Sequence, residues 1–155
     1  MRLSPNFTLV ELCRSSTATQ HGINNIPSQN TVQGLAVIKA LIAGAKAILE
    51  PIRKQYGRFS PSSGYRAPQV NRLVGSSDSS QHTLGEAFDV PPPLGVTLEE
   101  FATWCWKNLP YDQLIVERKK GEEWLHISHK ANGKQRRQAL QKTDNGPYLQ
   151  WRPKA

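Results

Sequence analysis

The sequence predicts an α+β protein in which helices flank a small antiparallel sheet. A chain of 155 residues is long enough to bury one hydrophobic core, so we expect a single domain over residues 1–155. One long segment has apolar residues at helical spacing, and two short segments in the second half of the chain have strand-like sequences. Because helices and strands do not alternate along the chain, a parallel α/β sheet is not expected.

The first 60 residues predict loops followed by one long helix. Pro27 and the neighbouring asparagines favour turns, so residues 1–30 are expected to be loop-rich. Between residues 31 and 56, apolar side chains recur every three or four positions, which predicts an amphipathic helix. Pro51 lies inside this segment and is expected to bend or end the helix.

Three short elements are expected next. Residues 59–63 are compatible with a short strand, and Pro68 suits the first turn of a helix that runs to about Val74. A loop of Gly and Ser follows at residues 75–80. Residues 87–90, which are apolar apart from Asp89, then predict a short buried strand that ends at three consecutive prolines.

A helix and a hairpin are expected in the second half of the chain. Thr97 and Glu100 have the spacing of a capping box, which marks the start of a helix. Residues 113–117 and 124–128 have strand-like sequences and are joined by the polar residues 118–122. This arrangement predicts an antiparallel hairpin.

The chain is basic, and its excess positive charge is concentrated near the end. There are 20 Lys and Arg residues against 12 Asp and Glu, a formal net charge of +8. Residues 130–155 hold seven of the basic residues and one acid, Asp144. We expect this segment to be either a solvated tail or a contact surface for an anionic polymer such as a bacterial cell wall. No nucleic-acid-binding motif accompanies the charge, so a specific nucleic-acid partner is not expected.

Other classes of protein are not favoured. The apolar stretch 35–52 is interrupted by charged residues, so membrane insertion is not expected. The first residues lead into mixed sequence without an apolar segment, so no signal peptide is expected. Cys13 and Cys105 are predicted to be buried thiols rather than parts of a disulfide or a zinc knuckle.

Three residues could form a catalytic zinc site on a face of the sheet. Catalytic zinc takes three protein ligands, often His and carboxylate, and keeps one position open. His82 and Asp89 are separated by six residues, and Gly85 between them permits a tight turn. His126 alternates with apolar residues along its strand and therefore points to the opposite face from them. On spacing alone, these residues could equally be an ordinary loop histidine, a strand-end acid and an exposed strand residue.

Four motifs match, in order and spacing, those of a known family of zinc peptidases. They are Ser63-Gly64-Tyr65-Arg66, the S-x-H-x-x-G-x-A-x-D pattern of Ser80–Asp89, the D-Q-L-I-x-E pattern of Asp112–Glu117 and the W-x-H-x-S pattern of Trp124–Ser128. Over about residues 5–140 the chain resembles the peptidase M15 family of D-alanyl-D-alanine carboxypeptidases, dipeptidases and phage endolysins. The stretch Phe7–Leu12 is similar to the start of the phage-associated branch. The family shares its fold with the hedgehog signalling domain.

The resemblance implies one zinc ion bound by His82, Asp89 and His126. It also implies that Arg66 holds a carboxylate of a peptide substrate, for which a guanidinium fork is well suited. A surface salt bridge is the alternative role for this arginine. Ser80 is expected to hydrogen-bond either the substrate or a group that supports the metal ligands, although a serine in a loop is also ordinary. Its neighbour Gln81 is expected to contact substrate.

Two glutamates are candidates for the general base that a zinc peptidase needs. Glu117 closes the Asp112–Glu117 motif, whereas Glu123 lies three residues before His126. We favour Glu117 because its motif is matched as a block.

The implied function is that of a zinc metallopeptidase acting on peptidoglycan stem peptides. The family includes D-Ala-D-Ala carboxypeptidases and L-Ala-D-Glu endopeptidases, and the sequence does not choose between them. A phage or prophage origin is implied, with a monomer that stays in the cytoplasm until release to the anionic cell wall, or that is part of the virion. The alternative is a non-catalytic zinc-containing binding or virion structural module on the same fold.

Overall fold

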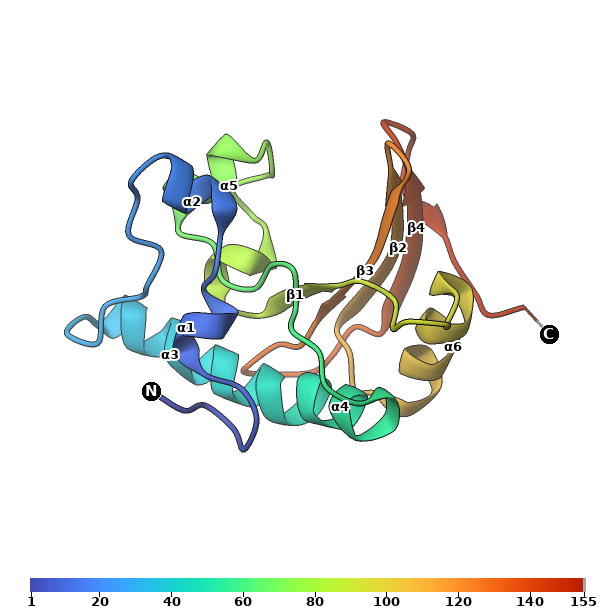
Figure 1. The fold of residues 1–155 in the computed structure, drawn as a ribbon, viewed down its shortest axis with the longest axis horizontal. Helices are drawn as coiled ribbons and strands as arrows, with labels where there is room; N and C mark the ends of the chain where they lie inside the picture. The colour runs from blue at the N-terminus through green and yellow to red at the C-terminus, as the bar shows by residue number, and fades with distance from the viewer. Residues whose placement is uncertain (155) are drawn as a thin grey trace.

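A five-stranded sheet forms the centre of the structure, a computed structural model that describes residues 1–154 (Figure 1). In spatial order the strands are β1 (Ala87–Val90), β3 (Glu122–Ser128), β2 (Gln113–Lys119), β4 (Gln138–Thr143) and β5 (Leu149–Gln150). In Figure 1 the N-terminal helices lie to the left of this sheet and the long helix runs beneath it. The predicted α+β class is confirmed.

The helices and helical turns cover most of the first half of the chain. They are α1 (Leu9–Leu12), α2 (Ser16–Gln20), α3 (Val32–Gly44), the π turn η1 (Ala45–Leu49), α4 (Glu50–Tyr56), α5 (Pro68–Leu73), the 3₁₀ turn η2 (Gln81–Leu84) and α6 (Leu98–Asn108). The capping box predicted for α6 is present, with hydrogen bonds in both directions between Thr97 and Glu100.

The long helix continues through Pro51 to Tyr56, so the expectation that this proline could end the helix is wrong. A proline inside an α-helix loses one hydrogen bond and its ring obstructs the carbonyl four residues earlier. Here the preceding turn, η1, is π-helical, and Pro51 occupies the first turn of α4. The wider π turn removes the regular hydrogen-bond register that the proline ring would obstruct.

The apolar face of the long helix is part of the hydrophobic core. By length and composition, residues Val32–Tyr56 could cross a membrane, but half of the apolar window is buried inside the protein. Its buried side chains pack with residues of the sheet and of α6 in one cluster. Burial in this core accounts for the apolar composition of the helix. Cys13 and Cys105 are buried and unpaired, as predicted.

The predicted hairpin is longer than expected and its turn is shorter. Strands β2 and β3 pair antiparallel up to Lys119 and Glu122, so only Lys120 and Gly121 form the turn. Both turn residues have positive φ, at 51° and 80°, which is typical of the tight turns that match the twist of a hairpin. The short strand predicted at residues 59–63 is reduced to a single bridge between Ser63 and Asp89.

Two strands lie in the segment predicted as a basic tail, so this segment is part of the fold, although most of its Lys and Arg side chains are exposed. Strand β4 pairs with β2 in parallel, which makes the sheet mixed rather than wholly antiparallel. Trp151 is only 4% exposed, and its Nε1–H donates to Oε2 of Glu99 at 3.0 Å. Strand β4 contains few apolar residues, so its sequence does not predict a strand.

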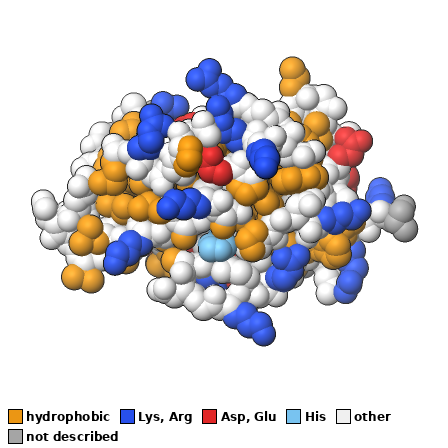
Figure 2. All heavy atoms as spheres, turned by 90° about the horizontal axis from the view of Figure 1, so that it is seen from below, with side chains coloured by type: hydrophobic (Ala, Val, Ile, Leu, Met, Phe, Trp, Pro, Cys, Tyr) orange, Lys and Arg blue, Asp and Glu red, His pale blue; other side chains and the backbone are white. Residues whose placement is uncertain are grey.

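Lys and Arg side chains are spread across the face shown in Figure 2 rather than gathered in one patch.

Replacement of Trp151 by alanine tests whether the C-terminal segment is part of the fold. We expect Trp151→Ala to lower the free energy of unfolding by about 3 kcal/mol, because it removes a large buried side chain. Leu149→Ala, at a position that is 55% exposed, should change it by about 0.5 kcal/mol or less. Urea unfolding measures both changes, and equal small effects would mean that the segment does not contribute to the core.

Candidate active site

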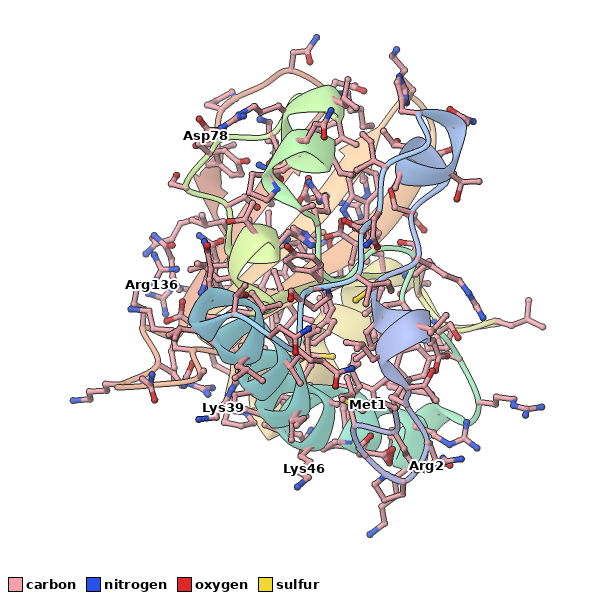
Figure 3. All side chains as sticks on the ribbon, turned by 90° about the vertical axis from the view of Figure 1, so that its left-hand side faces the viewer. Met1, Arg2, Lys39, Lys46, Asp78 and Arg136 are labelled. Carbon is pink, nitrogen blue, oxygen red and sulfur yellow. The ribbon has the colours of Figure 1, made fainter. Side chains whose placement is uncertain are left out.

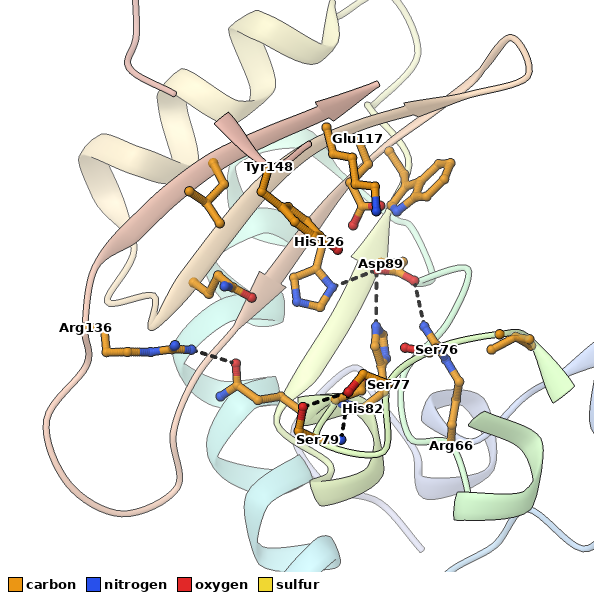
Figure 4. A pocket seen from close by; sticks show the side chains of 18 residues that line it. Arg66, Ser76, Ser77, Ser79, His82, Asp89, Glu117, His126, Arg136 and Tyr148 are labelled. Carbon is orange, nitrogen blue, oxygen red and sulfur yellow. Dashed lines mark hydrogen bonds and ion pairs between the residues drawn. The ribbon is translucent and has the colours of Figure 1, made fainter. Parts of the chain in front are cut away.

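A cavity of about 620 Å³ lies between the sheet and the Gly/Ser loop that precedes η2. Its lining includes His82, Asp89 and His126, as Figure 4 shows. A second cavity of about 400 Å³ shares Asp89 and Glu117 with it and extends toward the tip of the β2–β3 hairpin. Together they form a groove of a size suited to a peptide or other small ligand.

The three predicted metal ligands converge in this groove from three elements. His82 comes from η2, Asp89 from β1 and His126 from β3. Asp89 and His126 are register partners of the antiparallel β1–β3 pair, so their side chains lie on the same face. One ligand atom from each of the three residues lies within 4.8 Å of the other two, a grouping that could hold a metal ion.

The ring of His82 is oriented so that one nitrogen is free to bind a metal. Its Nδ1 lies 2.7 Å from the carbonyl oxygen of Gly64, to which it must donate its proton. Its Nε2 is buried and has no hydrogen-bond partner within residues 1–154. A metal-binding histidine commonly shows this arrangement, because the hydrogen bond at one nitrogen leaves a lone pair on the other. Gly64 is required here since a Cβ at this position would collide with the carbonyl oxygen of Leu12.

The carboxylate of Asp89 lies between the two histidines at a separation that suits zinc. Its Oδ1 is 3.3 Å from Nε2 of His82 and 3.2 Å from Nδ1 of His126. Two atoms bound at about 2.0–2.1 Å to one tetrahedral zinc would be about 3.3–3.4 Å apart, so these residues fit that ion. Burial alone would raise the pKa of Asp89, but the adjacent imidazole groups of His82 and His126 lower it well below its usual range.

Gly85 makes the turn between the first two ligands possible. It ends η2 with a φ of 74°, a left-handed conformation that side chains other than glycine disfavour. A Cβ at this position would also lie 2.8 Å from the carbonyl oxygen of Val37 on α3. The chain can therefore reverse direction over the long helix and enter β1 with Asp89 facing His82.

Only one of the two candidate glutamates faces this cluster. Glu117 is the register partner of Trp124, on the same face of the sheet as His126, and lines the groove. Burial raises its pKa, an effect that nearby Asp89 increases and the charge of His126 opposes. Glu123 lies three residues before His126, and strand alternation turns it to the opposite face, where it pairs with Arg118 at 3.4 Å.

Arg66 contacts Asp89 directly. Its Nη2 is 3.4 Å from Oδ2 of Asp89, while its other nitrogens donate to Asn71 and to Ser63. The side chain is 13% exposed, so the guanidinium sits inside the groove wall. The carboxylate that Arg66 binds in this structure therefore belongs to Asp89, and its predicted contact with substrate remains a prediction.

A comparison of the sequence with models of protein families assigns the chain to a family. The model of a family described as peptidase M15 matches residues 5–128, which include all four motifs. The chain belongs to the peptidase M15 family. The resemblance seen in the sequence is thus confirmed, and the match ends at the last residue of β3. A comparison with curated proteins finds no match.

In this M15 peptidase, Ser80 and Gln81 both line the groove. Oγ of Ser80 accepts a hydrogen bond from the backbone N–H of His82 at 3.3 Å, which caps η2 and helps to place that histidine. The amide of Gln81 donates to Oδ2 of Asp112 at 3.1 Å. Both side chains therefore support the site, and their expected contacts with substrate stay predictions.

The sequence patterns do not point to several residues in and around the groove. Arg136, Lys142 and Tyr148 line the larger cavity, whereas Asn71 and Asp112 bind the lining residues Arg66 and Arg136. Asn71 and Asp112 are fully buried polar residues, a property that the sequence does not reveal. Arg136 binds Asp112 through its backbone N–H and its guanidinium and lies at the far end of the groove from Arg66 (Figure 4).

Metal titration tests the His–Asp–His cluster. The full chain should bind one equivalent of Zn²⁺, and Asp89→Ala or His126→Ala should weaken binding by more than about 100-fold because each removes a ligand. His21→Ala, at an exposed position outside the cluster, should bind like the wild type. Isothermal titration calorimetry measures the affinities, and unchanged binding by Asp89→Ala would exclude this site.

The ion pair between buried Asp112 and half-exposed Arg136 predicts a dependence of stability on pH. Burial would raise the pKa of Asp112, but hydrogen bonds and charge from Arg136 lower it. A lowered carboxyl pKa adds stability above the pKa of the unfolded chain, and this stability is lost as pH falls through the folded-state value. Asp112→Asn should therefore cost about 2 kcal/mol at pH 7 and flatten the loss of stability below about pH 4.

The matched control for this substitution is Asp78→Asn. Asp78 forms an exposed pair with Arg72 and lies at the periphery, as Figure 3 shows. Its loss should change the free energy of unfolding by about 0.5 kcal/mol or less. Urea unfolding at several pH values compares the variants, and parallel pH curves for wild type and Asp112→Asn would contradict the assignment.

Proposed function

We propose that this peptidase is zinc-dependent and hydrolyses peptide bonds in peptidoglycan stem peptides. The observation that carries the proposal is the buried Nε2 of His82, which has no hydrogen-bond partner in residues 1–154 and lies 3.3 Å from Oδ1 of Asp89, in a group with His126 whose ligand atoms lie within 4.8 Å of one another. Membership of the M15 family supplies the peptidase activity. The sequence resemblance and the basic net charge support a wall-derived substrate.

The chain's own residues divide the catalytic work as follows. His82, Asp89 and His126 would hold the ion, which when bound polarises a carbonyl group and lowers the pKa of a water molecule. Glu117 faces the same groove, and its raised pKa suits a group that accepts a proton from the attacking water and delivers it to the leaving amine. Arg66 holds Oδ2 of Asp89, so that Oδ1 stays directed at the histidines.

The proposal extends to the setting in which the enzyme acts. We propose a phage- or prophage-encoded enzyme that reaches the wall on release from the cytoplasm or as part of a virion. The groove that continues on both sides of Asp89 supports an extended peptide as substrate.

Digestion of peptidoglycan fragments tests the function. The zinc-loaded full chain is incubated with muropeptides, with and without a chelator, and the products are identified by mass spectrometry. Release of a terminal alanine would indicate a carboxypeptidase, and cleavage between L-Ala and D-Glu an endopeptidase. If the zinc-loaded protein cleaves fragments of no wall type, the proposal is wrong and a binding module on this fold is favoured.

Two glutamine substitutions test the assignment of the base. Glu117→Gln should lower the rate of hydrolysis by about 10²–10⁴-fold, because it removes the proton acceptor while leaving the zinc ligands in place. Glu123→Gln, on the opposite face of the sheet, should stay within about twofold of the wild type, since only an exposed ion pair is lost. Zinc affinity serves as the control for both, and the reverse pattern of rates would assign the role to Glu123.

A further inference from the structure

The three Lys and Arg residues that line the larger cavity differ in their partners. Arg66 pairs with Asp89 at 3.4 Å, and Arg136 pairs with the buried Asp112 at 2.7 Å. Lys142 also lines the cavity, but no carboxylate oxygen of the described residues lies within 4.0 Å of its ammonium group. Of these three lining residues, Lys142 is therefore the one that forms no ion pair with a residue of the described chain.

The parallel pairing of β4 with β2 brings Lys142 to the face that carries the proposed metal ligands. In this pairing Lys142 is the register partner of Glu117, and Leu140 is the register partner of Ile115. Ile115 also pairs with His126 on the other side of β2. Register partners lie on the same face of a sheet. Strand β4 thus extends the wall of the groove beside Glu117.

Tyr148 holds the ammonium group of Lys142 in this position. The Nζ atom lies 4.4 Å from the centre of the Tyr148 ring, a cation–π contact. Tyr148 is more than half exposed and also lines the cavity, above His126 in Figure 4. The ring supplies no negative charge that could form an ion pair with the ammonium group. The ammonium group therefore has an aromatic contact on one side and remains able to bind an anion in the cavity.

We propose that Lys142, supported by Tyr148, forms a subsite that binds a carboxylate group of the peptide substrate. An ammonium group binds a carboxylate through a charge-assisted hydrogen bond without requiring a planar, two-point geometry. Arg66, by contrast, has all three nitrogens engaged within the protein. Both Lys142 and Tyr148 lie beyond residues 5–128 matched by the family, so this subsite belongs to the part of the chain outside that match.

This inference rests on the proposed function of the groove. A stem peptide offers two kinds of carboxylate, the one at its C-terminus and the free one on its glutamate. The experiment therefore uses three peptides of the same sequence: one with both carboxylates, one with a C-terminal carboxamide and one with the glutamate carboxylate amidated.

Binding is measured on the zinc-loaded full chain carrying Glu117→Gln, in which turnover is suppressed. Isothermal titration calorimetry compares this protein with the same protein carrying Lys142→Gln. We expect Lys142→Gln to weaken binding of the peptide with both carboxylates by about 10-fold, the loss of one hydrogen bond to a charged group. One amidated peptide should bind both proteins equally, and it identifies the carboxylate that Lys142 contacts.

Matched variants separate this role from a general effect of charge. Lys39, which projects from α3 into solvent, provides the charge control, and Lys39→Gln should leave all three affinities unchanged (Figure 3). Lys142→Arg should retain the preference for the carboxylate, and Tyr148→Ala should reduce it by about threefold by removing the cation–π contact. An equal loss for all three peptides, no loss, or no binding of any peptide would overturn the subsite.

Hydrolysis by the wild type keeps the two proposals apart. Cleavage of these peptides by wild type, with affinities unchanged by Lys142→Gln, would reject the subsite and leave the peptidase proposal intact. A preference that depends on Lys142 without any cleavage would keep the subsite and reject the hydrolytic function.

Discussion

The carboxylate of Asp89 connects the parts of the chain that form the site. Its Oδ1 lies between the rings of His82 and His126, and its Oδ2 contacts Arg66. Its backbone N–H and carbonyl bond to the Ser62–Ser63 segment, which precedes the glycine that orients His82. The surrounding histidines lower the pKa of this carboxylate despite its burial. Strand β1, although only four residues long, is therefore the element on which the geometry of the groove depends.

The close packing of two glycines sets the position of the first histidine. Gly64 approaches the backbone of Leu12, and Gly85 passes over α3 in a left-handed conformation. Neither position tolerates a side chain without moving its neighbour, so the loop between the two glycines is held against the N-terminal helices. The ring of His82 then reaches the carbonyl of Gly64 with little freedom to rotate, which is the preorganisation that a metal site needs.

The segment after β3 gives the groove its second wall. The ion pair between Arg136 and buried Asp112 anchors the loop that leads into β4, next to Gln81 and the metal-ligand cluster. From there β4 runs beside β2 and places Lys142 opposite Glu117. The family motifs thus contain the proposed metal ligands and the proposed base, while the C-terminal segment supplies further polar and aromatic residues that line the groove.

Local patterns determined much of this protein from the sequence alone. Apolar spacing predicted the long helix, the capping box predicted α6, and four motifs identified the family and the residues that cluster in the groove. Strand alternation, applied to Glu123 as well as to its neighbours, also distinguishes the two glutamates. Only the tertiary structure decided that β4 pairs in parallel with β2, that a π turn accommodates Pro51, and that Lys142 faces Glu117. These features depend on contacts between residues distant in sequence, and a strand such as Gln138–Thr143, with few apolar residues, carries no local pattern that specifies its partner.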